Sequence, residues 1–297
     1  MQVTATRMPR TGVFRGRLGF LGLVLAYGAI VLACLWTLAA AGDLSLGRKP
    51  WENLVKSLGE FAPPSFMDLW FGPERLEYRS DDGTLLRVEN RREVEASFIA
   101  GLARATWTTF QIATLGSLLA AVMAMPLGLL SARNLKAPRW AARAASSVLD
   151  ALRAIHTLVF GLVLVGIVGL GPTAGILAIA LHSMGTYGKL YAESIETLDM
   201  GAVDAVRATG ASPSQVFFSA VWPSVLPQFV SNHLYVWEFN IRDSTILGLI
   251  GAGGLGLLIS EAVSLFQWSR LATIILVVVA LVMAFDALSR RIRKALL

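Results

Sequence analysis

The chain has 297 residues, of which 55% are hydrophobic and 15% charged, and its formal net charge at pH 7 is +6. Soluble globular domains contain about 25% charged residues, so this composition excludes an ordinary soluble protein and indicates a membrane protein. The basic residues lie beside apolar stretches, which favours a role in membrane orientation over nucleic-acid binding. The single cysteine, Cys34, excludes a disulfide within the chain and a cysteine-based metal cluster.

Six apolar stretches predict an all-α polytopic membrane protein, because a helix of about 20 apolar residues crosses a bilayer. The predicted transmembrane helices are residues 18–41, 106–130, 147–169, 172–190, 224–248 and 268–288. The first is interpreted as a retained anchor, since the apolar region of a cleaved signal peptide has only about 7 to 15 residues. Gly171 and Pro172 predict a tight turn between the third and fourth spans.

Basic residues near the span ends predict the orientation. They form clusters before the first span, between the second and third, and after the sixth: Arg7, Arg10, Arg15 and Arg17; Arg133, Lys136, Arg139 and Arg143; Arg290, Arg291, Arg293 and Lys294. With six spans all three clusters fall on one side. We therefore expect residues 1–17 and both termini to be cytoplasmic.

Residues 43–97 form a polar loop that is expected on the opposite, external side. Apolar residues at helical spacing predict an amphipathic helix on the membrane surface. These residues are Trp51, Leu54, Val55, Leu58 and Phe61. The segment LEYRSDDGTLLRVE alternates in polarity around Asp82-Gly83 and predicts a β-hairpin.

The loop 191–223, between the fourth and fifth spans, contains a helix-breaking pattern. Met200-Gly201 is expected to interrupt the incoming helix, and residues 202–209 can form two helical turns before Gly210 caps them. Ser212, Pro213 and Gln215 then match a capping box that begins a second helix, which Pro223 is expected to end. A helix this short is marginal alone. It is interpreted as a docking element for a partner, with an ordinary structured loop as an equal alternative.

This loop resembles the cytoplasmic loop of the permease subunits of ABC importers, which carries a Glu-Ala-Ala motif followed at fixed spacing by Gly and Pro. Asp204-Ala205-Val206, Gly210 and Pro223 keep that spacing. The chain departs from the motif by Asp for Glu and Val for Ala, and by Ala220 and Trp222 where a larger aliphatic residue and Leu are usual.

From about residue 98 the resemblance narrows to the phosphonate and phosphite importer permeases. It is carried by LRAIHTLVFGLVLVGIVGLGP, GKLYAESIE, AVRATGAS and LPQFVSNHLYVWEFNIRDSTILGLIGAGGLG. His156 stands where Pro is usual, and residues 70–92 look like an insertion in the external loop.

The resemblance implies a type I ABC importer permease fold, with residues 98–297 as its core, in a bacterial inner membrane. It also implies a homodimer, an external or periplasmic substrate-binding protein, and two ATP-binding subunits that hold the ATP and Mg. The coupling contacts would come from Asp204, Ala205, Arg207, Ala208, Gly210, Ala211 and Ser212. This chain itself would bind no cofactor, and a pair of related permeases remains an alternative to the homodimer.

Arg242 is the leading candidate for the translocation pathway, because an ionisable group at membrane depth usually faces a cavity or the bundle interior. A phosphorus oxyanion needs cationic and hydrogen-bonding partners. Those partners are expected from Arg242, Ser244, Thr245, Glu238 and Asn240. The alternative is a structural ion pair of Arg242 with Asp243 or Glu238.

The segment GAGGLG contains Gly251, Gly253, Gly254 and Gly256 and formally matches a dinucleotide-binding motif. It follows a membrane helix and not a strand, so a re-entrant turn or gate beside the pathway is expected, with a loop of no transport role as the alternative.

The remaining polar residues do not indicate a catalytic or metal-binding site. Asp150 and Arg153 share a helix face and are interpreted as a structural pair, and the three histidines lack a second metal ligand at helical spacing. The chain contains no catalytic triad, HExxH or P-loop pattern, so an enzyme is disfavoured and the ATPase must be a separate chain. A permease for another small solute and an intramembrane enzyme remain alternatives, and the sequence does not select one phosphorus oxyanion.

Overall fold

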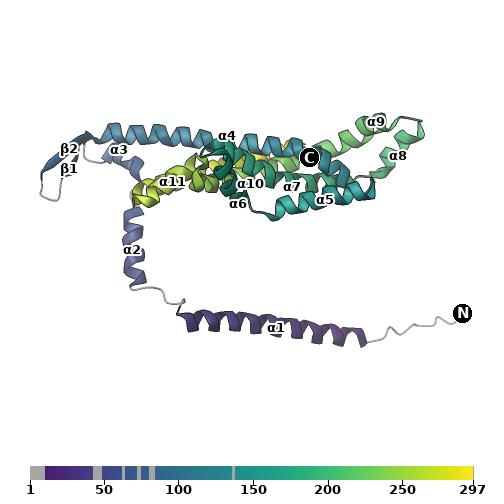
Figure 1. The fold of residues 1–297 in the computed structure, drawn as a ribbon, viewed down its shortest axis with the longest axis horizontal. Helices are drawn as coiled ribbons and strands as arrows, with labels where there is room; N and C mark the ends of the chain where they lie inside the picture. The colour runs from purple at the N-terminus through teal and green to yellow at the C-terminus, as the bar shows by residue number, and fades with distance from the viewer. Residues whose placement is uncertain are drawn as a thin grey trace. The chain divides into compact units, whose positions relative to one another are not determined.

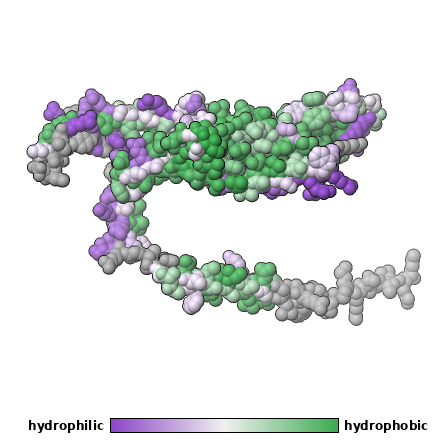
Figure 2. All heavy atoms as spheres, in the orientation of Figure 1, coloured by the Kyte–Doolittle hydropathy of each residue, from purple (hydrophilic) through white to green (hydrophobic). Residues whose placement is uncertain are grey.

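The computed structural model describes residues 11–42, 49–61, 64–71, 75–79, 84–135 and 138–296, which are mostly helical (Figure 1). The chain divides into two compact units, residues 1–57 and 58–297. The long helices of the second unit are α4 (Arg91–Ser131), α5 (Arg139–Ala154), α6 (Thr157–Val168), α7 (Pro172–Glu196), α10 (Trp222–Leu247) and α12 (Trp268–Leu296). Figure 2 shows apolar side chains over the middle of this unit and polar ones toward its ends, as expected for a bundle that crosses a bilayer.

The first unit contains α1 (Thr11–Ala41), whose side chains are exposed from Phe20 onward. It is long and apolar enough over Phe20–Ala41 to cross a membrane, in agreement with the predicted anchor. The predicted surface helix is α2 (Pro50–Phe61), which begins in this unit and ends in the second. Its Trp51, Leu54 and Val55 are exposed, as an interfacial helix requires.

Among the described residues, three helices are long and apolar enough to cross a membrane by length and composition: Phe20–Ala41, Arg91–Ser131 and Trp268–Ala295. Two bent helix pairs raise this number to five if each pair forms one span. The predicted span 172–190 lies in α7, which does not belong to this set. The described helices therefore do not confirm the predicted count of six.

Helix α7 lies at the centre of the second unit and packs against α4, α5, α6 and α10. Ile179, Tyr187 and Ile195 are fully buried on it. Since these neighbours cover much of its surface, α7 can carry polar groups such as Ser183 and Lys189 that a lipid-facing helix would exclude. This covering explains why α7 is less apolar than a span exposed to lipid.

The predicted span 147–169 covers parts of α5 and α6, which meet at an angle of 87°, so this segment is bent. Ile155 and His156 adopt extended conformations between the helices, with φ of −91° and −65°. The freed backbone groups are satisfied locally: His182 Nδ1 bonds the Ile155 carbonyl at 2.8 Å, and His156 Nδ1 accepts a hydrogen bond from the Leu158 N–H at 3.2 Å. An apolar run gives no signal for such a bend.

His156 is the N-cap of α6, so His156→Ala is expected to destabilise the fold by about 1 kcal/mol. His156→Pro is expected to cost less, because proline fixes φ near −65° and the preceding Ile155 already has the extended conformation that a following proline favours. Thermal unfolding of the detergent-purified protein tests this order. A lower midpoint for the proline variant than for the alanine variant would contradict it.

The loop between α7 and α10 breaks at residues 197–199, and not at Met200-Gly201 as predicted. Helix α8 (Met200–Ala208) includes those two residues and is capped by Asp199, whose Oδ1 accepts from the Gly201 N–H at 2.9 Å. Gly210 has φ of 79°, the left-handed conformation expected of a cap. The capping box of Ser212 and Gln215 is confirmed at the start of α9 (Pro213–Val216).

Pro223 does not end the second helix of this loop, which corrects the sequence prediction. Helix α9 continues through a wide π turn, Phe217–Val221, directly into α10. The Trp222 N–H bonds the Phe217 carbonyl, five residues back, and Pro223 follows within the first turn of α10. A proline is tolerated there because the π turn interrupts the regular i→i−4 backbone hydrogen bonds. The missing N–H and the bulky ring of proline therefore disrupt little at this position.

A second break follows α10, where another π turn, Gly248–Ala252, leads to α11 (Leu255–Ser264) at an angle of 57°. Gly251, Gly253 and Gly254 have φ of 96°, 85° and 72°, which other residues rarely adopt. Gly256 lies so close to the Thr245 carbonyl oxygen and to Gly248 that a side chain would clash with backbone atoms.

Gly256→Ala is therefore expected to destabilise the protein by about 3 kcal/mol, the upper end of ordinary overpacking, because backbone atoms cannot move aside as a flexible side chain can. Gly101→Ala in α4 is the matched control: nothing lies within 4 Å of its added carbon, so a neutral or slightly stabilising effect is expected. Size-exclusion chromatography after graded heating measures both. Equal stability of the two variants would refute the close approach.

Two strands, β1 (Arg75–Arg79) and β2 (Leu85–Asn90), pair antiparallel with Arg75 opposite Asn90. The turn predicted at Asp82-Gly83 lies outside the described residues. Asn90 also caps α4 by accepting from the Arg92 N–H at 3.1 Å, so α4 begins before the predicted core boundary at residue 98. Placement of the hairpin outside the membrane stays a prediction.

Candidate functional site

The predicted coupling residues surround one short helix that is anchored on a single side. Val203 of α8 is buried and packs with Val216, Ala220 and Val221. The predicted coupling residues are exposed, except for the partly buried Ala211: Asp204, Ala205, Arg207, Ala208, Gly210 and Ser212. Asp204 and Arg207 form an ion pair at 3.0 Å on the surface. A surface with a fixed apolar base and an exposed charged face is suited to bind another protein.

Three of the five predicted pathway residues form structural hydrogen bonds, and one of them joins neighbouring helices. Asn240 is fully buried; its Oδ1 accepts from the Ser183 hydroxyl at 2.9 Å and its Nδ2 donates to Ser117 at 2.8 Å, which joins α10 to α7 and α4. Ser244 and Thr245 donate to carbonyls of their own helix at 2.8 and 2.7 Å. Their side chains are therefore occupied by structural hydrogen bonds.

Arg242 has a different environment, since 53% of its side chain is exposed. Its Nη2 lies 3.8 Å from Glu238 Oε1, and Arg293 of α12 lies 3.9 Å from the other Glu238 oxygen. The alternative partner, Asp243, is buried and accepts a hydrogen bond from Thr157 at 2.8 Å. Arg242 is thus loosely held and available to a further anion.

One face of the C-terminal part of α10 is exposed, and Arg242 lies on it. Tyr235 (58%), Phe239 (42%) and Ile246 (39%) lie on this face, and Leu249 (45%) continues it in the following π turn. Their spacing of three and four residues, counted through Arg242, places them in one stripe of a helix. The stripe connects Arg242 to the cavity described next.

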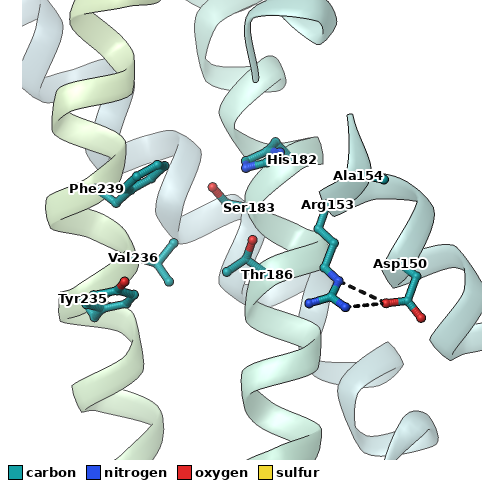
Figure 3. A pocket seen from close by; sticks show the side chains of 9 residues that line it. All are labelled: Asp150, Arg153, Ala154, His182, Ser183, Thr186, Tyr235, Val236 and Phe239. Atoms are coloured by element: carbon teal, nitrogen blue, oxygen red, sulfur yellow. Dashed lines mark hydrogen bonds and ion pairs between the residues drawn. The ribbon is translucent and has the colours of Figure 1, made fainter. Parts of the chain in front are cut away.

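A cavity of about 540 Å³ lies between α5, α7 and α10 (Figure 3). Its polar lining consists of Asp150, Arg153, His182, Ser183, Thr186 and Tyr235. Ala154, Val236 and Phe239 supply the apolar lining. Figure 3 shows Ser183 and Thr186 directed from α7 toward α10, with Val236 and Phe239 directed back toward α7. Sequence reasoning missed this cavity, because its walls come from three distant segments.

The charges at one end of the cavity are shared among three side chains. Arg153 binds Asp150 Oδ1 through Nε at 3.0 Å and Nη2 at 2.9 Å. Lys189 binds Asp150 Oδ2 at 2.8 Å and the Ser146 hydroxyl at 2.6 Å. The predicted Asp150–Arg153 pair is present, and Lys189 joins it. Two cations on one carboxylate leave an excess positive charge.

The glycine-rich turn is fixed to neighbouring segments. The Leu255 N–H donates to Thr109 of α4 at 2.8 Å, and the Gly171 N–H donates to the Gly251 carbonyl at 3.0 Å. Gly254 lies against Thr109 without room for a side chain. These contacts make the turn a defined structure, and its role as a gate stays a prediction. Among the described residues, no group of His, Cys, Asp and Glu has the arrangement of a metal site.

Comparison with known proteins gives a consistent set of relatives. Residues 124–297 match the family described as binding-protein-dependent transport system inner membrane component. The chain is 39% identical over 272 residues to the phosphite transport system permease protein PtxC of Stutzerimonas stutzeri, covering 92% of this chain and 87% of the relative. It is 37% identical over 191 residues to the phosphate-import permease protein PhnE of Mycolicibacterium smegmatis, covering 63% of this chain and 35% of that protein.

The fold is also similar to a solved structure. An inward-facing conformation of the MetNI methionine ABC transporter aligns with a TM-score of 0.61 and 22% sequence identity, covering 68% of this chain and 98% of that chain. At this level of identity the likeness shows the permease fold.

Proposed function

Because the chain belongs to the family of binding-protein-dependent transport system inner membrane components, we propose that it is the permease subunit of an ABC importer for phosphite, phosphonate or a related phosphorus oxyanion. It is a multi-pass inner membrane protein. Its six spans and cytoplasmic termini are part of this proposal. The observation that carries the substrate class is the similarity, over most of both chains, to a phosphite permease.

The exposed stripe of α10 supports an assembly of two permease copies. Ile246 of α10 and Leu249 of the following π turn expose apolar surface that a second copy can cover, and their three-residue spacing suits packing against another helix. Two-fold pairing would bring two Arg242 side chains to a common pathway. The cations there would then attract an anion from both sides.

The exposed face of α8 supports docking to a separate ATP-binding subunit. The sequence contains no P-loop, so ATP and Mg would be held by that subunit. The apolar base of α8, packed through Val203, joins the short helix to the continuous helix that leads into α10. Movement of the partner would therefore reach the pathway through a rigid connection. The substrate would arrive from an external binding protein.

The test is reconstitution of the complex with its ATPase and binding protein in liposomes. We expect ATP-dependent uptake, and ATP hydrolysis stimulated by the loaded binding protein, with at least one of phosphite, methylphosphonate, 2-aminoethylphosphonate and phosphate. Stimulation by none of these four anions, in a complex that still hydrolyses ATP, would contradict the proposed substrate class. A methionine-loaded binding protein provides the comparison for an importer of another small solute.

A further inference from the structure

We propose that the cavity between α5, α7 and α10 is a binding site for organophosphonates, in which Arg153 binds the phosphorus oxygens and Phe239 and Val236 pack against the carbon substituent. This inference rests on the proposed function and specifies which of its candidate substrates the permease itself selects.

Arg153 can bind an anion without leaving the Asp150 carboxylate unpaired. The Asp150 carboxylate is already held by Lys189, whose side chain is only 18% exposed and is fixed by Ser146 as well. Arg153 is 52% exposed, and its contacts with Asp150 use only Nε and Nη2 on a single oxygen. The remaining guanidinium donors can bind an oxyanion, for which the planar fork of arginine is suited.

Additional donors lie along the same wall. His182 is not among them, because its Nδ1–H is donated to the Ile155 carbonyl at 2.8 Å. The hydroxyls of Thr186 and Tyr235 line the cavity and have no hydrogen-bond partner among the described residues. Two unoccupied hydroxyls beside an excess positive charge form a suitable environment for the oxygens of a phosphonate.

The opposite wall favours a substrate with an apolar end. Val236 and Phe239 of α10 face the polar residues of α7 across the cavity. Phosphate would place a fourth oxygen against these side chains without a hydrogen-bond partner, whereas a methyl or aminoalkyl group can pack there. The cavity of about 540 Å³ is within the range of small-molecule sites, roughly 300–1,000 Å³, and has room for a substituent beyond the phosphorus group.

The site can be tested by protection of one engineered cysteine. Cys34 is the sole native cysteine, so a Cys34→Ser chain carrying Ala154→Cys places one reactive thiol at the wall of the cavity without removing a proposed donor. We expect methylphosphonate to slow labelling by a cationic methanethiosulfonate reagent in membrane vesicles. Phosphate should need a concentration at least about tenfold higher, because one methyl-sized group in an apolar pocket discriminates by about 10- to 200-fold.

Two substitutions test the roles assigned to the polar and the apolar wall of the cavity. Arg153→Gln should abolish protection, while Arg143→Gln, an exposed position on the same helix outside the cavity, should retain it. Phe239→Ser should remove the preference for methylphosphonate over phosphate. Leu226→Ser is its control, since Leu226 lies on the same helix with a similar exposure, 40% against 42%.

Failure of the site and failure of the proposed function give different results. Normal oxyanion uptake by the unmodified complex, with no protection by methylphosphonate of the thiol engineered at position 154, would overturn the site and leave the proposed function in place. Protection that persists in Arg153→Gln would also overturn it. Absence of uptake for every phosphorus oxyanion would instead contradict the proposed function.

Discussion

Replacing Asp204 with Lys is expected to reduce ATP-driven uptake by roughly thirtyfold while the permease stays folded. Asp204 is 65% exposed, and its pairing with Arg207 is a surface ion pair of small energetic value, about 0–1 kcal/mol. Loss of that pair should leave stability nearly unchanged. A reversed charge in a protein interface costs several kcal/mol, and about 2 kcal/mol is enough for a thirtyfold weaker complex. The measurement is uptake into liposomes beside the ATPase activity of the same preparation.

Asp204→Glu is the matched control, because it keeps the charge at the same exposed position of α8. Its uptake is expected to be close to that of the unmodified chain. The Lys variant should elute and unfold like the parent, which separates lost coupling from lost folding. Full uptake by Asp204→Lys would mean that this face of α8 does not dock to the ATPase.

Local chemistry explains which parts of the fold could be predicted. The α8–α9 elbow was predicted because Gly210, Ser212 and Gln215 have strong intrinsic preferences, and the capping box forms among residues that are adjacent in sequence. The apolar stretches likewise predicted α1, α4 and α12. In each case the interactions that determine the local structure are made between residues close in sequence, or between apolar side chains and lipid.

The bends could not be predicted in the same way. The break at Ile155 and His156 depends on His182, which is distant in sequence and supplies the hydrogen bond to the freed Ile155 carbonyl. Continuation through Pro223 depends on a π turn that ordinary helix-end signals do not reveal. Both features follow from packing in the bundle, so a pattern read along one segment does not contain them.

The candidate site shows the same limit. Spacing alone predicted that Asp150 and Arg153 share a helix face, but not that Lys189 of α7 competes for the same carboxylate. Membrane depth alone singled out Arg242, while the neighbouring hydroxyls of Ser244 and Thr245 bond their own helix. Only the packed helices show which polar groups are already occupied and which are available to a substrate.

Arg242→Ala is expected to reduce oxyanion uptake by about 100-fold with the complex still assembled. The side chain is half exposed and its contact to Glu238, at 3.8 Å, is long, so little of the fold depends on it. A hydrogen bond to a charged group contributes about 1.5–3 kcal/mol, and about 2.8 kcal/mol corresponds to a factor of 100. Uptake, together with size-exclusion chromatography of the complex, measures the two effects separately.

The ion-pair alternative makes a different prediction for Glu238. If Arg242 served only as a partner of Glu238, then Glu238→Gln would impair the protein as strongly as Arg242→Ala, because both variants break the same pair. A pathway role predicts that Glu238→Gln retains uptake, since it removes a competing negative charge and releases the arginine for the substrate. Arg293→Gln, which breaks the second contact of Glu238, controls for disturbed packing between α10 and α12. Equal losses in Glu238→Gln and Arg242→Ala would leave Arg242 with a structural role alone.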